Sequence, residues 1–211
     1  MKKTFIFYHI YCNEYTLPIV IDQITKIVFS GLYEYVDLIY CFLAGEQDYI
    51  NKIHMYILNQ GKKIKIADIG INDTSYERFT LLQIPKYIDD SDKFLYIHSK
   101  GITKHSSLPV YTWRNIMEYY LISKYKDCIE KLETHDAVGI MWEDKPWPHF
   151  SGNFWWSNGK YFLSLPNYIN TDDYYATEAY IGSKHPNAFS FHERTHDCYY
   201  TYWPFGKYID S

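Results

Sequence analysis

The residues of this sequence that are best placed to do chemistry follow the run FLYI, at His98, Ser99 and Lys100. Four residues with strong β preference lead directly into them, and Gly101 follows, which favours a turn. A strand that ends in polar, cationic and flexible residues is typical of a binding site. An imidazole and an ammonium with no carboxylate beside them indicate a site that holds negative charge.

Two arginines extend this prediction. Arg78 lies in the first turns of the helix expected after the third strand, and Arg114 begins the helix expected after HSKG. Each alone is typical of a solvated surface charge. Together with Lys100, at strand ends and helix N-termini, they predict a diphosphate site. A unit charge about 4 Å from a phosphate contributes about 4 kcal/mol at an effective dielectric of 20, so two or three such contacts can stabilise a departing nucleotide diphosphate.

The elements that must position these residues alternate along the first two thirds of the chain. Strands are predicted over 4–11, 36–45, 62–70, 93–101 and 135–142. Helices are predicted over 17–32, 46–61, 74–87 and 111–133, the third opened by a capping box of Thr74 and Glu77 and bent or broken near Pro85. This order predicts a single α/β domain with a central, mainly parallel mixed sheet flanked by helices.

In such a sheet, ligands bind beyond the carboxyl ends of the strands. The strand exits at 8–13, 68–73 and 98–104 should therefore share one rim. The acidic triplet Asp90-Ser91-Asp92 precedes its strand, so it is predicted to be a solvated turn at the opposite edge. Two aromatic, turn-rich stretches, 149–166 and 189–210, are expected to fold over the rim and form the other wall of the site.

Composition limits the possible partners. Of the 211 residues, 20% are aromatic, which suits stacking on sugars or bases but can equally reflect a codon bias. The net charge of −4, with no polybasic run, argues against nucleic-acid binding. No apolar run is long enough to cross a bilayer, and four scattered cysteines without a CxxC pair indicate a reducing, cytoplasmic compartment.

Other motifs are weaker. HERTH, residues 192–196, matches the HExxH of zinc peptidases, but its flanks are β-prone rather than helical, and only 15 residues remain for a third ligand. Neither GxGxxG nor GxxxxGK[ST] occurs, so the fingerprints of NAD enzymes and P-loop NTPases are missing from the sequence.

Two segments carry a family resemblance. The run TSYERFTLLQIPKYIDDSDKFLYIHSKGI resembles the part of GT-A glycosyltransferases that ends in their LYLDxD metal-binding strand. HFSGNFWWSNGKYFLSLP resembles their sugar and acceptor pocket, and TDDYYATEAYIG their following acidic helix. Within that family the chain looks most similar to chlorovirus domains of capsid glycan synthesis. The resemblance implies transfer of a hexose or deoxyhexose from a UDP-sugar to a glycan acceptor, with retention, a divalent cation (Mn²⁺ or Mg²⁺), and, for a virus, the host-cell cytoplasm.

A glycosyltransferase interpretation divides the chain into a nucleotide-binding half, about 1–105, and a sugar and acceptor half, about 106–211. It assigns the nucleotide and diphosphate to Tyr8, His9, Ile10, Tyr11, Asp68, Arg78, His98, Ser99 and Lys100. It assigns the sugar and acceptor to Arg114, Gly152, Asn153, Trp155 and Trp156. Lys100, Asn153 and Glu178 are the expected catalytic residues, although Glu178 fits an ordinary surface glutamate equally well.

The sequence departs from the family where His98, Ser99 and Lys100 occupy the DxD position. His98 is then the predicted metal ligand, joined by His192 or His196, with Lys100 replacing part of the metal's charge. Two alternatives stay open: a non-catalytic carbohydrate-binding module and a metal-dependent hydrolase built on HERTH. The ending PFGKYIDS resembles a domain edge, so the chain is expected to be a fragment of a longer protein with further domains after residue 211.

Overall fold

The structure, a computed structural model, describes residues 2–73, 75–204 and 206. The strands are β1 (Thr4–Cys12), β2 (Leu38–Gly45), β3 (Ile64–Ile71), β4 (Lys93–His98), β5 (Ala137–Gly139), β6 (Trp142–Glu143), β7 (His149–Phe150), β8 (Trp155–Asn158) and β9 (Ala188–Ser190). The α-helices are α1 (Thr16–Phe29), α2 (Leu32–Tyr35), α3 (Gln47–Leu58), α4 (Arg78–Leu81), α5 (Leu108–Glu118), α6 (Tyr125–Lys131), α7 (Gly159–Ser164) and α8 (Ala176–Ala179). Short 3-10 helices cover Ile84–Lys86, Ile102–Lys104 and Tyr180–Gly182, and a π-helical turn covers Tyr119–Ser123.

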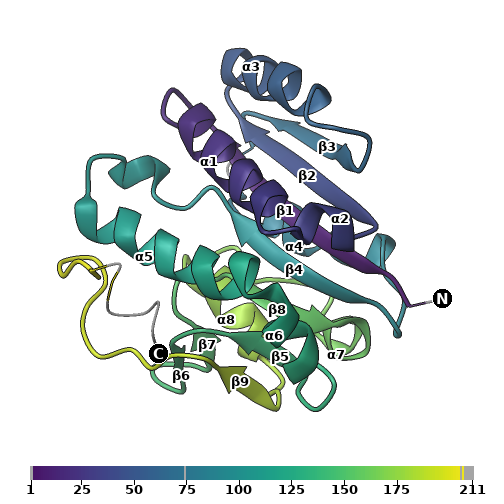
Figure 1. Cartoon of the computed structure of the whole chain (residues 1–211), viewed down its shortest axis with the longest axis vertical. Helices are drawn as coiled ribbons and strands as arrows, with labels where there is room; N and C mark the ends of the chain where they lie inside the picture. Colours follow the sequence, from purple (N-terminus) through teal and green to yellow (C-terminus); the bar gives the residue numbers. More distant parts are fainter. Residues whose placement is uncertain (1, 74, 205, 207–211) are drawn as a thin grey trace.

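One seven-stranded sheet runs through both halves of the chain, in the order β3-β2-β1-β4-β8-β5-β9 (Figure 1). Its neighbouring strands are parallel except at β8, which pairs antiparallel with both β4 and β5. β6 and β7 form a separate two-stranded ribbon. The prediction of a single α/β domain with a mainly parallel mixed sheet is confirmed.

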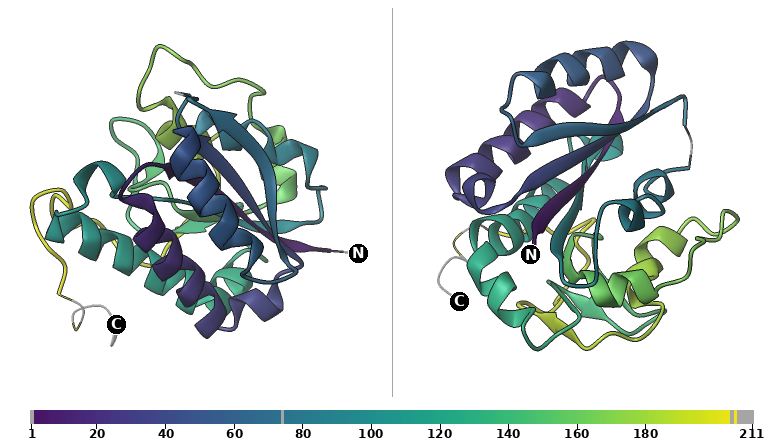
Figure 2. Two further views of the ribbon diagram at one scale, coloured as in Figure 1. Left: turned by 90° about the horizontal axis from the view of Figure 1, so that it is seen from above. Right: turned by 90° about the vertical axis from the view of Figure 1, so that its right-hand side faces the viewer.

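Helices cover both faces of this sheet (Figure 2). Because successive side chains of a strand point to opposite faces, Ile6 and Ile10 pack toward α1, α3, α5 and α6, whereas Phe5 and Phe7 pack toward α4 and α7. The inner strands are apolar on both faces for this reason, as β1 illustrates with eight of its nine residues buried. No described helix has the length and apolar character required to span a membrane.

The second half of the chain differs from the prediction of two loop-rich stretches over the rim. Trp155 and Trp156 belong to β8, a central strand, and each packs into a different core layer with no exposed surface. The predicted helix 111–133 is interrupted by the π-helical turn between α5 and α6. The pattern of apolar residues in the sequence is the same for an aromatic surface loop and for a buried strand such as β8, which pairs with β4 and β5.

The helix predicted over 74–87 is short. α4 ends at Leu81, and the following 3-10 turn contains Pro85, in line with the predicted break. Thr74, the predicted cap, lies outside the described residues. Asp92 is at the amino end of β4, as predicted, but it is buried rather than solvated, since its carboxylate accepts hydrogen bonds from the Lys3 N–H (2.9 Å) and the Asp89 N–H (2.8 Å).

Candidate functional site

The carboxyl ends of β1 and β4 bring two histidines together. His9 and His98 are register partners on these parallel strands. The His9 Nδ1 lies 2.8 Å from the Thr80 hydroxyl, and the His98 Nε2 lies 3.0 Å from the Gly152 carbonyl oxygen. Ser99 continues the connection, because its N–H donates to the His9 carbonyl at 3.0 Å. The predicted rim therefore exists, with His98 at its centre.

Glu77, immediately before α4, reaches into the same cluster. Its carboxylate accepts hydrogen bonds from the Asn153 amide and from the Tyr96 hydroxyl (3.3 Å), and it lies 3.5 Å from the His98 Nδ1. Burial raises the pKa of Glu77, although His9 and then the Asn153 hydrogen bond act to lower it. The carboxylate is thus part of the site and does not cap the helix, which corrects the capping-box prediction.

Lys100 is sheltered by the rim cluster, but no carboxylate pairs with its ammonium group among the described residues. Its Nζ lies 3.8 Å from the centre of the Trp113 ring, and it forms no ion pair with any residue that the structure describes. Burial lowers the pKa of Lys100, and the nearby charges of Glu178 and Glu77 only partly oppose this shift. A sheltered cation whose charge is incompletely balanced is a favourable position for an anionic ligand.

Glu178 enters the cluster from α8. Its Oε1 accepts a hydrogen bond from the Gly152 N–H at 3.0 Å, and the side chain is half-buried. Gly152 has a φ of +91°, and a Cβ there would lie 2.6 Å from the Met117 sulfur. Glycine suits this turn, and the same residue binds Glu178 through its N–H and His98 through its carbonyl.

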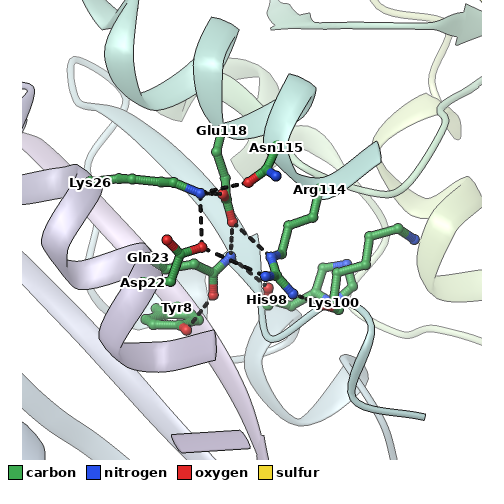
Figure 3. A network of polar contacts seen from close by, with 9 residues as sticks. All are labelled: Tyr8, Asp22, Gln23, Lys26, His98, Lys100, Arg114, Asn115 and Glu118. Carbon is green, nitrogen blue, oxygen red and sulfur yellow. Dashed lines mark hydrogen bonds and ion pairs between the residues drawn. The ribbon is translucent and has the colours of Figure 1, made fainter. Parts of the chain in front are cut away.

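A second polar cluster lies behind the rim, between α1 and α5 (Figure 3). The buried Glu118 carboxylate binds the Lys26 ammonium (2.5 Å), the Gln23 amide (2.9 Å) and the Arg114 Nε (3.3 Å). Gln23 also donates to the His98 carbonyl at 3.3 Å, and Arg114 donates to the Lys100 carbonyl at 3.0 Å. These bonds fix the backbone on either side of Ser99.

Several residues that were predicted to contact ligand lie elsewhere. Tyr8 and Ile10 are fully buried in the core layer between the sheet and α1, α3, α5 and α6, and the Tyr8 hydroxyl binds Gln23. Neither Trp155 nor Trp156 presents a ring face to solvent. Asp68, on β3, accepts a hydrogen bond from the Gln83 amide at 2.8 Å and lies two strands from β1.

The other predicted residues are occupied by the protein itself. The Arg114 guanidinium belongs to the Glu118 cluster, and the Arg78 Nη1 donates to the carbonyls of Asn170 (3.3 Å) and Asp173 (3.4 Å). Asn153, with a φ of +57°, uses its amide to hold Glu77 and to accept from the Trp155 indole at 2.8 Å. Asn153 is therefore placed to position the cluster.

At the very end of β1, Tyr11 is half-buried. Its N–H donates to the Ser99 hydroxyl at 3.0 Å. Of the four β1 residues assigned to the nucleotide, Tyr8, His9 and Ile10 are buried, and the His9 Nδ1 is bonded to Thr80. The half-buried Tyr11 side chain stays the predicted contact for a base or ribose.

The predicted metal ligands do not converge. His98 is bonded to Gly152, whereas the rings of His192 and His196 pack on Trp203, at 4.9 and 4.4 Å between centroids. Within residues 2–73, 75–204 and 206, no group of three or more His, Cys, Asp or Glu side chains is arranged to hold a metal ion. The donor set does not fit a divalent cation. HERTH itself adopts no helix, so the geometry of a zinc peptidase is not formed.

A cavity of about 570 Å³ lies at the opposite, amino-terminal edge of the sheet, against Lys93, Asp92 and Lys160. Its buried ammonium is already neutralised, since the Lys93 Nζ binds the Glu133 carboxylate and the Ile129 carbonyl (2.9 Å). The charge at this edge is paired, whereas Lys100 has no ion-pair partner in the part of the chain that the structure describes, so the carboxyl edge is the better candidate for an anion.

The rim histidines give a testable dependence of stability on pH. Burial is the main cause that lowers the pKa of His9 from 6.5 to about 4 and that of His98 to about 3. Both rings are neutral in the folded protein, whereas the unfolded chain takes up protons below about pH 6.5. Their stabilising contribution is complete above that pH and is lost as the pH falls toward the folded pKa values.

We expect the free energy of unfolding to fall less between about pH 7 and about pH 5 in a His9→Gln/His98→Gln variant than in the wild type. Urea denaturation at several pH values measures this difference. Glu77 acts in the opposite direction, since its raised pKa adds stability at low pH that is lost as the pH rises. The informative quantity is therefore the difference between the wild type and the variant in how the free energy of unfolding changes with pH. Equal slopes for the two proteins would contradict the assignment.

Structural comparison places the fold among known ones. HddC from Yersinia pseudotuberculosis superposes with a TM-score of 0.54 at 13% identity, covering 91% of each chain. A 4-diphosphocytidyl-2C-methyl-D-erythritol synthase from Anaerococcus prevotii gives a TM-score of 0.45 at 11% identity, covering 91% of this chain and 90% of that one. At 13% identity, the similarity to HddC establishes a shared fold.

Comparison by sequence identifies a family but no curated relative. No curated protein matches the chain significantly by sequence. One family model matches residues 7–197, which include β1 from Phe7 onward, all of β2 to β9 and every residue of the rim cluster. The chain therefore belongs to the family described as "Domain of unknown function (DUF8361)".

Proposed function

We propose that this protein is a glycosyltransferase that transfers a hexose or deoxyhexose from a UDP-sugar to a glycan acceptor. The observation that carries the proposal is the sheltered Lys100 ammonium at the carboxyl edge of a mainly parallel sheet, beside two glutamates and without an ion-pair partner among the described residues. Ligands bind at this edge in open α/β sheets, and a cation in this position suits a diphosphate. The GT-A resemblance of the segments that contain FLYIHSKG and SGNFWW supports the choice of reaction.

The roles follow from position. Transfer breaks the bond between the anomeric carbon and a diphosphate oxygen, which leaves with the bonding electrons. The acceptor hydroxyl oxygen bonds to that carbon, and its proton passes to the leaving diphosphate. Lys100 would stabilise the negative charge that develops on the leaving diphosphate. Glu178, whose half-buried carboxylate accepts the Gly152 N–H, would face the reacting carbon, and Tyr11 would contact the nucleoside. Most contacts with the nucleotide would thus come from about residues 1–105, and most contacts with the sugar and acceptor from about residues 106–211.

The resemblance predicts dependence on a divalent cation, but the predicted ligands His98, His192 and His196 do not converge. The roles given to Lys100 and Glu178 therefore require no cation. Retention, a viral capsid glycan as acceptor and the host cytoplasm are further parts of the same proposal.

UDP release from a panel of UDP-hexoses and UDP-deoxyhexoses, with and without Mn²⁺, tests the proposal. We expect release from at least one donor, and Glu178→Gln should reduce the rate by roughly 100-fold or more if this carboxylate acts on the reacting carbon. Glu143→Gln, on the β6–β7 ribbon, is the control. A wild-type protein that hydrolyses or transfers no UDP-sugar under any of these conditions would refute the proposal.

The second candidate is a non-catalytic carbohydrate-binding module, which the exposed tyrosines favour. It predicts glycan binding without UDP affinity, so the same panel distinguishes the two.

A further inference from the structure

Four aromatic rings from three separate segments form a continuous row beside the site. Tyr76 contacts Tyr174 (5.6 Å between centroids), Tyr174 contacts Tyr175 (5.1 Å), and Tyr175 contacts Trp147 (5.3 Å). The three tyrosines are 51%, 66% and 51% exposed. Large apolar rings that gather on a surface instead of in the core mark a binding surface more often than single exposed rings do.

Arg78 holds this row in place. Its Nη1 binds the carbonyls of Asn170 and Asp173 in the segment between α7 and α8, and its guanidinium lies 5.8 Å from the Tyr76 ring centre. The Asp173 carboxylate in turn accepts the Tyr175 N–H at 2.9 Å. This segment extends away from the sheet in the right-hand view of Figure 2, yet its backbone is anchored to α4. A buried arginine thus fixes two exposed tyrosines in one arrangement, which reduces the entropy lost on binding.

The row leads into the rim cluster. Tyr175 immediately precedes α8, the helix that carries Glu178, and Glu178 binds the Gly152 N–H. On the far side, Tyr199 packs edge-on against Trp113 at 5.0 Å, and the Lys100 ammonium lies 5.9 Å from the Tyr199 ring. A ligand on the row would have one end at Glu178.

The charges around the row select the type of ligand. Asp172, Asp173 and Glu178 are on the same segment as the two tyrosines, and the nearest arginine, Arg78, is buried and already bonded. This arrangement disfavours a polyanion such as a nucleic acid. It suits a neutral sugar chain, whose C–H faces pack on aromatic rings and whose hydroxyls donate to carboxylates.

We infer that Tyr76, Tyr174, Tyr175 and Trp147 form the acceptor subsite of the proposed transferase and bind a neutral oligosaccharide that is several sugars long. The role of this surface as an acceptor subsite rests on the proposed function, whereas glycan binding to these rings does not depend on that function. The acceptor is accordingly an existing glycan chain, with its reacting end at Glu178 and the following sugars along the row.

The test uses an array of neutral and acidic oligosaccharides with the whole protein, followed by titration of the strongest neutral binder. Tyr174→Ala and Tyr175→Ala should each weaken binding roughly tenfold, as expected for aromatic residues at the centre of an interface. Tyr168→Ala is the matched control, because Tyr168 is 70% exposed and makes no ring contact within the described part of the chain. UDP affinity should be unchanged in all three variants.

Each result has one meaning. Neutral glycan binding that both row variants weaken, and the control does not, supports the subsite. Binding that the row variants leave unchanged, a preference for acidic glycans, or no binding to any glycan would overturn it. Wild-type glycan binding without UDP affinity would refute the transferase and leave the binding surface intact, so the failures of the two proposals are distinguishable.

Discussion

Replacing Lys100 with methionine is expected to weaken UDP-sugar binding by roughly 10- to 100-fold, because a hydrogen bond to a charged group contributes about 1.5–3 kcal/mol. Methionine keeps the length of the side chain and its packing on Trp113 while removing the charge. The fold should tolerate the change, since Lys100 forms no ion pair among the described residues and burial already disfavours its charged form. Calorimetric titration with the donor measures the effect.

Lys104→Met is the matched control for this experiment. Lys104 is exposed on the loop after β4, and its ammonium lies 4.4 Å from the Tyr199 ring centre. An exposed charge is screened by salt, so its removal should change the affinity by no more than roughly twofold at physiological ionic strength. Equal losses in the two variants would show that a diffuse positive field, and not Lys100, holds the diphosphate.

Replacing Glu118 with leucine should lower the free energy of unfolding by about 3–5 kcal/mol, the typical cost of leaving buried charges without their partner. Its carboxylate neutralises Lys26 and Arg114 and is itself 1% exposed. Burial raises the pKa of Glu118, while Lys26 and then Arg114 lower it, so the paired, ionised form depends on these two cations. Urea denaturation measures the loss of stability.

Glu130→Gln, at an exposed position of α6, is the control and should leave the stability almost unchanged. A second readout tests the connection with the site. Because Gln23 and Arg114 bind the carbonyls of His98 and Lys100, Glu118→Gln should weaken donor binding even where the protein remains folded. A Glu118→Leu variant as stable as the wild type would contradict the role of this cluster.

The sequence was sufficient to predict the rim but not its full composition. The run FLYI predicts β4 because it combines β preference with apolar character, and the parallel topology then places His98 and Lys100 at the carboxyl edge. Glu77 was missed because a glutamate three residues after a threonine also satisfies a helix capping box. Its position just after the exit of β3, on the predicted rim, was the available signal.

The tryptophans illustrate the opposite error. Trp155 and Trp156 were assigned to a sugar pocket because their segment resembles that pocket in GT-A glycosyltransferases and its aromatic, turn-rich composition suggested a stretch folded over the rim. Instead, the chain returns to insert β8 antiparallel between β4 and β5, where both indoles are buried. Pairing between strands some sixty residues apart depends on tertiary packing, which local patterns do not encode. Glu118 lies four residues after Arg114 in α5, a local spacing that favours an ion pair, whereas its other partners, Lys26 and Gln23, come from α1 and are not indicated by any local pattern.

Whether the carboxyl edge of the sheet binds a nucleoside diphosphate is measured by calorimetric titration of the wild-type protein with UDP, with and without Mn²⁺ and with GDP and CMP as comparison ligands. We expect saturable binding of UDP, weaker binding of the other two nucleotides, and affinity that remains when the metal is omitted, because Lys100 supplies positive charge at the diphosphate. A protein that binds UDP neither with nor without Mn²⁺ would contradict the proposed nucleotide site.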